Sequence, residues 1–193
     1  MVSKSSNNAS ELSPKYAVMG FLYIRPMYGY ELHKYLKTSL YEVWHISQSQ
    51  AYNIIKNLEK DNWITTTIQT QEKLPDRELL ALTQYGTTAF ETWLNTPTPG
   101  SARAIRVEFI TRLFFASHLG EGQYFRLIKE QGDNIRTSLE DLYSRLSLIP
   151  TDLVFNRMGL ELRISQLTAI LDWVENSTKY FKEGLNILAN EKH

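Results

Sequence analysis

Residues 49–82 read SQAYNIIKNLEKDNWITTTIQTQEKLPDRELLAL, and this stretch decides the fold. Its apolar residues first recur at helical spacing, which predicts a helix over residues 49–60. The run that follows, residues 63–70, is rich in β-branched side chains and predicts a strand. Proline and aspartate at 73–76 provide turn chemistry, and residues 77–82 return as a second strand. The stretch is therefore one helix followed by a β-hairpin.

Two shorter helical patterns precede this stretch, over residues 16–24 and 30–40. The first begins near Ser13-Pro14, because a serine side chain caps free helix amides and a proline at the first helical position costs no hydrogen bond. Another helix is expected after Thr83, behind the hairpin. Three helices followed by a β-hairpin are the layout of a winged helix-turn-helix, which places one helix in the major groove of DNA and the hairpin beside it.

The C-terminal half has a different pattern. Residues 95–101 contain two prolines and a glycine and mark the predicted domain boundary. A short apolar helix follows, and then two longer segments whose apolar residues alternate three and four positions apart, separated by Pro150. This predicts an antiparallel helical hairpin. The predicted fold is mainly α with a small β-hairpin wing: a disordered tail (1–12), a winged helix-turn-helix DNA-binding domain (13–95) and a helical, coiled-coil-like dimerisation domain (102–190).

The two heptad segments allow two interpretations. They can pack only against each other within one chain, or they can also join two chains. The apolar residues of the two segments and the aromatic residues beside them, such as Phe115 and Tyr180, present more apolar surface than one thin hairpin can bury. This favours a homodimer. The residues predicted to dimerise are Phe114, Phe125, Leu139, Leu142, Leu146, Leu160, Ile164, Leu167, Leu171 and Val174.

Net charge argues against strong DNA binding by a single chain. The 193 residues hold 21 Lys and Arg against 21 Asp and Glu, and residues 1–96 alone hold 9 of each. Many DNA-binding domains are basic, because neutralised phosphates supply most of the non-specific affinity. We therefore expect modest affinity per chain, raised by dimerisation.

Several classes of protein are not supported by the composition. The chain has no cysteine, so disulfides, thiol nucleophiles and thiolate metal sites are excluded. The four histidines show no metal-ligand spacing, and no phosphate loop or nucleophile motif occurs. No segment is apolar enough to span a membrane, and the polar residues 1–10 do not resemble a signal peptide. We expect a cytoplasmic protein that is not an enzyme and has no metal, no cofactor and no membrane partner.

Particular residues of the chain resemble the PadR family of bacterial transcriptional regulators. The resemblance covers roughly residues 16–183, and its C-terminal part looks like the helical domain that dimerises in the Vir-like branch. It implies a winged helix that binds double-stranded DNA. The residues that carry it are Gly29-Tyr30-Glu31-Leu32, Tyr52, Leu58-Glu59, Trp63-Ile64, Leu82-Thr83, Gly86, Arg112-Leu113-Phe114-Phe115 and Leu171-Asp172-Trp173.

Two positions depart from the pattern of that family. Members commonly have proline and glycine where the recognition helix begins, and this chain has Gln48 and Ser49 there. The wing usually ends with a basic run and paired tyrosines, whereas residues 76–80 read DRELL. The wing has therefore lost positive charge, which argues against strong contact between the wing and DNA.

The predicted recognition helix offers candidates for DNA contact. Ser49, Gln50, Asn53 and Lys56 face outward; Gln and Asn pair with both edges of adenine, while Ser and Lys suit phosphates or guanine. The alternative is an ordinary solvated helix face. Further candidates for contact with the DNA backbone are Ser47, Tyr52, Lys34, Lys37, Lys73 and Arg77.

Aromatic residues offer a candidate effector pocket between the two domains. Tyr16, Tyr23, Trp44 and Trp93 would line it, and the resemblance implies a small aromatic or drug-like effector. The alternative is that these are plain core aromatics, since nothing in the sequence singles out a pocket.

Two functions follow from these patterns. The first is a homodimeric regulator, expected to be a repressor, whose two recognition helices enter successive major grooves about 34 Å apart on a palindromic operator. The second is a winged-helix protein–protein module, an antirepressor or scaffold, which the neutral N-terminal half and the depleted wing favour. Salt dependence separates them, because DNA affinity falls steeply with salt.

Overall fold

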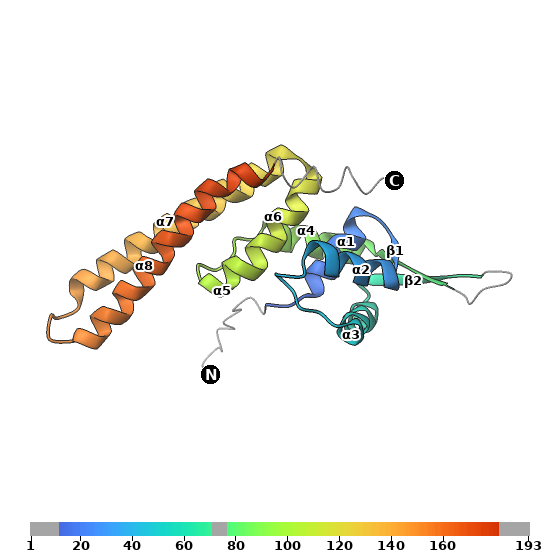
Figure 1. The fold of residues 1–193 in the computed structure, drawn as a ribbon, viewed down its shortest axis with the longest axis horizontal. Coiled ribbons are helices and arrows are strands. Elements are labelled where there is room, and N and C mark those ends of the chain that lie inside the picture. Colours follow the sequence, from blue (N-terminus) through green and yellow to red (C-terminus); the bar gives the residue numbers. More distant parts are fainter. Residues whose placement is uncertain (1–11, 71–76, 182–193) are drawn as a thin grey trace, which may run out of the picture.

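The structure is a computed structural model that describes residues 12–70 and 77–181. The molecule is elongated, with a winged helix at one end and a long helical hairpin that extends away from it (Figure 1). The predicted N-terminal tail, the wing turn with Lys73, and the last part of the predicted helical domain lie wholly or largely outside the described residues.

The winged helix has the element order that the sequence predicts, with one strand added. A three-stranded antiparallel sheet has the order β1-β3-β2, and the helices pack on it. The predicted helices and both hairpin strands are confirmed to within a residue or two. The elements are α1 (Lys15–Ile24), β1 (Met27–Tyr28), α2 (Gly29–Ser39), α3 (Gln48–Lys60), β2 (Ile64–Gln69), β3 (Arg77–Leu82) and α4 (Gln84–Asn95).

Strand β1 was absent from the predicted elements because two residues are too few to show an alternating pattern. It pairs with β3 so that Met27 lies opposite Leu80 and Tyr28 opposite Leu79. Met27 is buried, and Tyr28 lies beside the wing. The strand therefore brings the start of α2 next to the wing.

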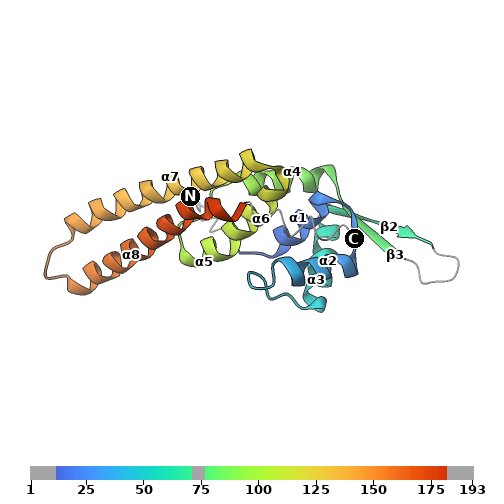
Figure 2. The same ribbon diagram turned by 45° about the horizontal axis from the view of Figure 1, so that its top comes forward.

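The C-terminal half is helical, and its last two long helices form the predicted antiparallel hairpin (Figure 2). Gly120, with φ of +117°, makes the turn between α6 and α7, a backbone conformation that favours glycine. The elements are α5 (Ala102–Ala104), a π-helical turn (Ile105–Phe109), α6 (Ile110–Leu119), α7 (Glu121–Leu148), α8 (Val154–Asn176) and a 3₁₀ turn (Ser177–Lys179).

The heptad seams pack within one chain, and the role of the same residues between two chains stays a prediction. Five of the ten predicted dimerisation residues are already buried: Leu139, Leu142, Ile164, Leu167 and Val174. The other five are half-buried against the same core: Phe114, Phe125, Leu146, Leu160 and Leu171. The five buried side chains have little surface left for a second chain, whereas the five half-buried ones keep some.

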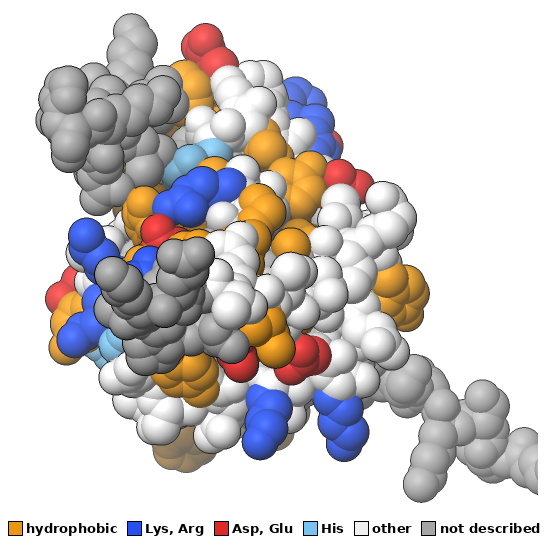
Figure 3. All heavy atoms as spheres, turned by 90° about the vertical axis from the view of Figure 1, so that its right-hand side faces the viewer, with side chains coloured by type: hydrophobic (Ala, Val, Ile, Leu, Met, Phe, Trp, Pro, Cys, Tyr) orange, Lys and Arg blue, Asp and Glu red, His pale blue; other side chains and the backbone are white. Residues whose placement is uncertain are grey.

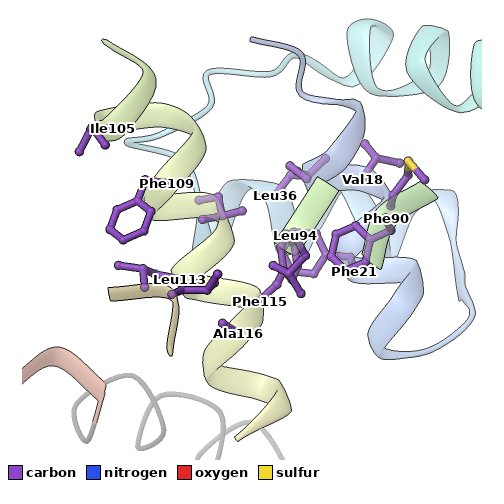
Figure 4. Close-up of a cluster of buried hydrophobic side chains, with 14 of the residues drawn as sticks. Val18, Phe21, Leu36, Phe90, Leu94, Ile105, Phe109, Leu113, Phe115 and Ala116 are labelled. Carbon is purple, nitrogen blue, oxygen red and sulfur yellow. The ribbon is translucent and has the colours of Figure 1, made fainter. Parts of the chain in front are cut away.

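One hydrophobic core runs through both halves of the molecule (Figure 4). Phe115 of α6 contacts Phe21 of α1 and Phe90 of α4 edge to face, at ring-centroid distances of 5.3 and 5.6 Å. A Cβ on Gly20 would lie 2.3 Å from the Phe115 ring, so α1 and α6 approach closely at this point. The winged helix is therefore fixed to the helical half by packing.

His118, in the last turn of α6, gives the fold a pH dependence. Burial lowers the pKa of His118 below its usual value, and the hydrogen bond between Nδ1 and the Phe114 carbonyl oxygen, 2.8 Å, partly opposes this. The unfolded chain binds a proton near pH 6.5 that the folded protein resists, so stability should decrease as pH falls below about 6.5. Urea midpoints measured above and below that pH should differ less in His118→Gln; an equal difference would contradict this role.

Candidate nucleic-acid interface

Helix α3, the predicted recognition helix, presents a polar face to solvent because its apolar residues are used for packing. Ala51, Ile55 and Leu58 are buried against the rest of the winged helix. The predicted contact residues Ser47, Ser49, Gln50, Tyr52, Asn53 and Lys56 are all exposed. Ser49, Asn53 and Lys56 are spaced by four and three residues, so they lie on one stripe of the helix.

Two of the predicted contact residues also cap α3. The backbone N–H of Gln50 donates to Ser47 Oγ at 3.3 Å, and the backbone N–H of Ser47 donates to the side-chain oxygen Oε1 of Gln50 at 2.9 Å. This capping box satisfies amides at the start of the helix. It also uses one of the two lone pairs of the Gln50 side-chain oxygen, whereas the NH₂ group of that side chain makes no hydrogen bond within the described residues.

The wing and the recognition helix enclose a groove of about 400 Å³. Tyr28 and Tyr30 stack there at a centroid distance of 5.8 Å, and the Arg77 guanidinium lies 5.7 Å from the Tyr28 ring centroid. The ring of Tyr52 packs near Gly29, where a Cβ would lie 3.2 Å from Tyr52 Cε1. The sequence reasoning missed Tyr28 and Tyr30 as part of this surface, and the Tyr-Gly-Tyr spacing was the signal for them.

Charge at this end of the molecule is mixed. Lys34 and Lys37 on α2 are exposed, as is Lys56 on α3, but Glu78 lines the same groove as Arg77. Basic and acidic side chains alternate over the face that Figure 3 shows, without one continuous basic patch. Phosphate contacts on this surface would therefore be few and separate, in agreement with the neutral N-terminal half.

A cavity of about 720 Å³ lies between the winged helix and the helical half. Tyr16, Trp44 and Trp93, all predicted pocket residues, line it together with Trp63. Tyr16 and Trp93 stack with a centroid distance of 4.6 Å and nearly parallel planes. The aromatic part of the cavity wall therefore comes from α1, α4, the loop before α3 and the residue before β2.

Tyr23 does not line this cavity, which corrects its assignment to the pocket. Its hydroxyl donates to Glu91 Oε1 at 2.8 Å, and its ring packs against Phe90 at 5.0 Å. The hydrogen bond to Glu91 is the main reason that the pKa of Tyr23 is raised. Tyr23 is seven residues after Tyr16 on α1, which is about 10 Å along the helix axis, so it meets a different part of α4.

A buried ion pair forms one side of the same cavity. Glu108 Oε1 accepts a short hydrogen bond from the Arg112 guanidinium, and both side chains are almost inaccessible to solvent, at 5% and 3%. The guanidinium carbon lies 4.9 Å from the Trp93 ring centroid. Burial lowers the pKa of Arg112 to about 10, although Glu108 acts in the opposite direction. Arg112 therefore stays charged at neutral pH.

Sequence reasoning missed this ion pair as a site feature. Its signal was an acid and an arginine four residues apart in a mostly apolar helical stretch, residues 105–116, which also contains Arg106 and Thr111. Glu108 lies in the π-helical turn, an irregularity that is frequent at functional sites. Its carboxylate also raises the pKa of Tyr16, after the larger effect of burial.

Two further observations concern other classes of site. Within residues 12–70 and 77–181, no group of three or more His, Cys, Asp or Glu is placed to hold a metal ion. In the same part of the chain, every helix is too short or too polar to cross a membrane.

Comparison with known proteins identifies relatives for this arrangement. The profile of the "Transcriptional regulator PadR-like family" matches residues 18–92. The curated Negative transcriptional regulator PadR of Bacillus subtilis (strain 168) is 28% identical over 130 residues, which span 66% of this chain and 70% of that protein.

Two solved structures of the Bacillus subtilis protein are similar to this chain, at a lower sequence identity than the curated relative. PadR in complex with operator DNA is 22% identical, with a TM-score of 0.43 and coverage of 86% of this chain and 98% of that chain. PadR in complex with p-coumaric acid is 22% identical, with a TM-score of 0.39 and coverage of 88% and 98%.

Proposed function

We propose that the chain, whose residues 18–92 match the PadR-like transcriptional regulator family, is a repressor that binds a palindromic operator as a homodimer. The observation that carries the proposal is the capped recognition helix α3, whose polar stripe is exposed beside the wing. Such a stripe reads base edges in the major groove, while neighbouring hydroxyl groups and lysines position the helix on phosphates.

The test is fluorescence anisotropy with DNA from upstream of the protein's own gene, against a scrambled duplex, at two salt concentrations. Tight, sequence-selective binding that weakens steeply with salt supports the proposal. Equal affinity for both duplexes calls for a genome-wide selection of binding sites. Failure to select any sequence there would contradict the proposal.

Lys56 is expected to supply one of the phosphate or guanine contacts. Lys56→Glu should weaken operator binding by about tenfold or more and reduce the slope of log affinity against log salt by about one, without affecting folding or dimerisation. Lys129→Glu on α7 makes the same change of net charge far from α3 and should leave affinity nearly unchanged. Equal affinities of Lys56→Glu and the wild type would refute this placement of the recognition surface.

The homodimer requires a surface that one chain leaves open, and α8 provides one. Phe155, Met158 and Leu162 are 85%, 54% and 61% exposed and share one face of the helix. Exposed apolar residues grouped in this way mark interaction sites. We propose that a second copy covers this face, so that the paired hairpins set the spacing of the two recognition helices at about 34 Å.

We also propose that the interdomain cavity takes a small planar aromatic effector that releases DNA. The stacked Tyr16 and Trp93 rings offer flat apolar walls, and Glu108 neutralises Arg112 at the side. Since the Bacillus subtilis relative was crystallised with p-coumaric acid, that compound is the first probe. Release of bound operator DNA by p-coumaric acid or a related compound, but not by benzoate at the same ionic strength, would support a selective effector site. No release by any member of an aromatic library would contradict the proposal.

The second candidate function is a protein–protein module with little DNA affinity. The mixed charge around the wing, with Glu78 beside Arg77, favours it. Salt separates the two functions, because binding through apolar surface would not weaken steeply with salt.

A further inference from the structure

Trp44 lies in the loop between α2 and α3, close to the recognition helix. Its backbone N–H donates to the Leu40 carbonyl oxygen at 2.8 Å, and the N–H of Ile46 donates to the Trp44 carbonyl oxygen at 3.0 Å. Ser47, the residue that caps α3, is the next residue after Ile46. Any displacement of Trp44 is therefore passed to the start of α3 through only two intervening residues.

Trp44 lines two cavities. One is the interdomain cavity, where Trp44 lies with Tyr16 and Trp93. The other, about 320 Å³ in volume, lies against α3 and is lined by Gln50 and Asn53 as well as by Trp44. The same residue thus borders the proposed effector site and the polar part of α3.

A single hydrogen bond fixes the indole to the helical half of the molecule. The Trp44 Nε1–H donates to Thr111 Oγ1 at 2.8 Å, across 67 residues of sequence. The Thr111 hydroxyl donates in turn to the Val107 carbonyl oxygen at 2.6 Å, so its lone pair is oriented toward the indole. Thr111 is fully buried in α6, next to Arg112 of the ion pair. Packing around Thr111 therefore holds the acceptor in place.

We propose that Trp44 is a positioning residue for the recognition helix, and that its hydrogen bond to Thr111 is the connection through which the interdomain cavity acts on DNA binding. The bond holds the loop that begins α3 against α6, so α3 is ordered before it meets DNA and less ordering is required on binding. A molecule in the cavity acts on operator affinity by displacing the indole from Thr111. This inference rests on the proposed DNA-binding function.

The test is a double-mutant cycle on operator affinity, with Trp44→Phe, Thr111→Val and the two combined. Each single variant should bind the operator about fivefold more weakly, which is the usual net effect of one hydrogen bond. The combined variant should be no weaker than either single variant, because both changes remove the same bond. Thr111→Ser retains the hydroxyl and should bind with near wild-type affinity.

Controls distinguish positioning from general destabilisation. Thr137→Val removes another threonine hydroxyl that donates to a carbonyl four residues earlier, on α7, and should leave operator affinity unchanged. A scrambled duplex, held mainly through phosphates, should bind every variant almost equally. Thermal unfolding identifies any variant that is not folded at the assay temperature. The operator affinities of the variants that are folded are then compared with that of the wild type.

The outcomes separate this inference from the proposed function. If the wild type does not select its operator, the proposed function fails first. If the wild type selects its operator but the single variants bind it with wild-type affinity, or their effects add in the combined variant, the positioning role of Trp44 is overturned.

Discussion

Leu162→Glu is expected to convert the protein to monomers and to lower its operator affinity by about 100-fold or more. Leu162 lies on the outward face of α8 with Phe155 and Met158, while the hairpin seam is filled by residues such as Leu167. A carboxylate buried there by a second copy would have no partner, which opposes association. A monomer also loses the gain of about 10²- to 10⁴-fold that joining two binding modules gives.

Sedimentation velocity and operator anisotropy, measured on the same samples, check this prediction. Thr168→Glu is the matched control, because it adds a carboxylate to α8 on the side that carries Glu161 and Asp172 rather than on the apolar face. That variant should remain a dimer. A dimeric Leu162→Glu protein with unchanged affinity would show that the second copy binds elsewhere.

Glu108→Leu is expected to lower the free energy of unfolding by about 3–5 kcal/mol. The change leaves the Arg112 guanidinium buried and charged, because the pKa of Arg112, about 10, is still well above neutral. Replacement of both partners, as Glu108→Leu with Arg112→Met, should recover most of the loss, since no buried charge remains. Urea denaturation at one fixed protein concentration measures both effects.

An exposed ion pair provides the comparison. Arg126 and Glu130 are 39% and 45% exposed, and Glu130→Leu should cost less than about 1 kcal/mol. If Glu108→Leu costs no more than Glu130→Leu, the buried pair contributes no more than an ordinary surface contact. If the double replacement remains as unstable as Glu108→Leu, the loss comes from packing rather than from the unpaired charge.

Much of the fold was predictable because its signals are local. The spacing of apolar residues, the β-branched run at residues 63–70 and the turn residues of the wing each act over a few positions, so α3 and the hairpin followed from the sequence. Strand β1 was not predictable, because Met27 and Tyr28 become a strand only when β3 lies beside them.

The candidate sites were predictable only in part. The outward face of α3 follows from helical periodicity, and three of the four predicted pocket aromatics do meet in one cavity. Tyr23 was expected in the same pocket but lies outside this cavity, because aromatic type alone does not show which part of a neighbouring helix a residue of α1 will meet. The ion pair and Thr111 were missed, because a charged or hydroxyl residue on a helix does not show from sequence whether it will be buried.

The sequence by itself determined the order and type of the elements, the exposed stripe of α3 and the neutral charge of the N-terminal half. Only the tertiary structure decided which apolar face of α8 is enclosed within one chain and which is left exposed. It also decided that Trp44 meets Thr111, 67 residues away. The physical reason is range: helix and turn propensities act over a few residues, whereas burial and long-range hydrogen bonds depend on how complete elements pack.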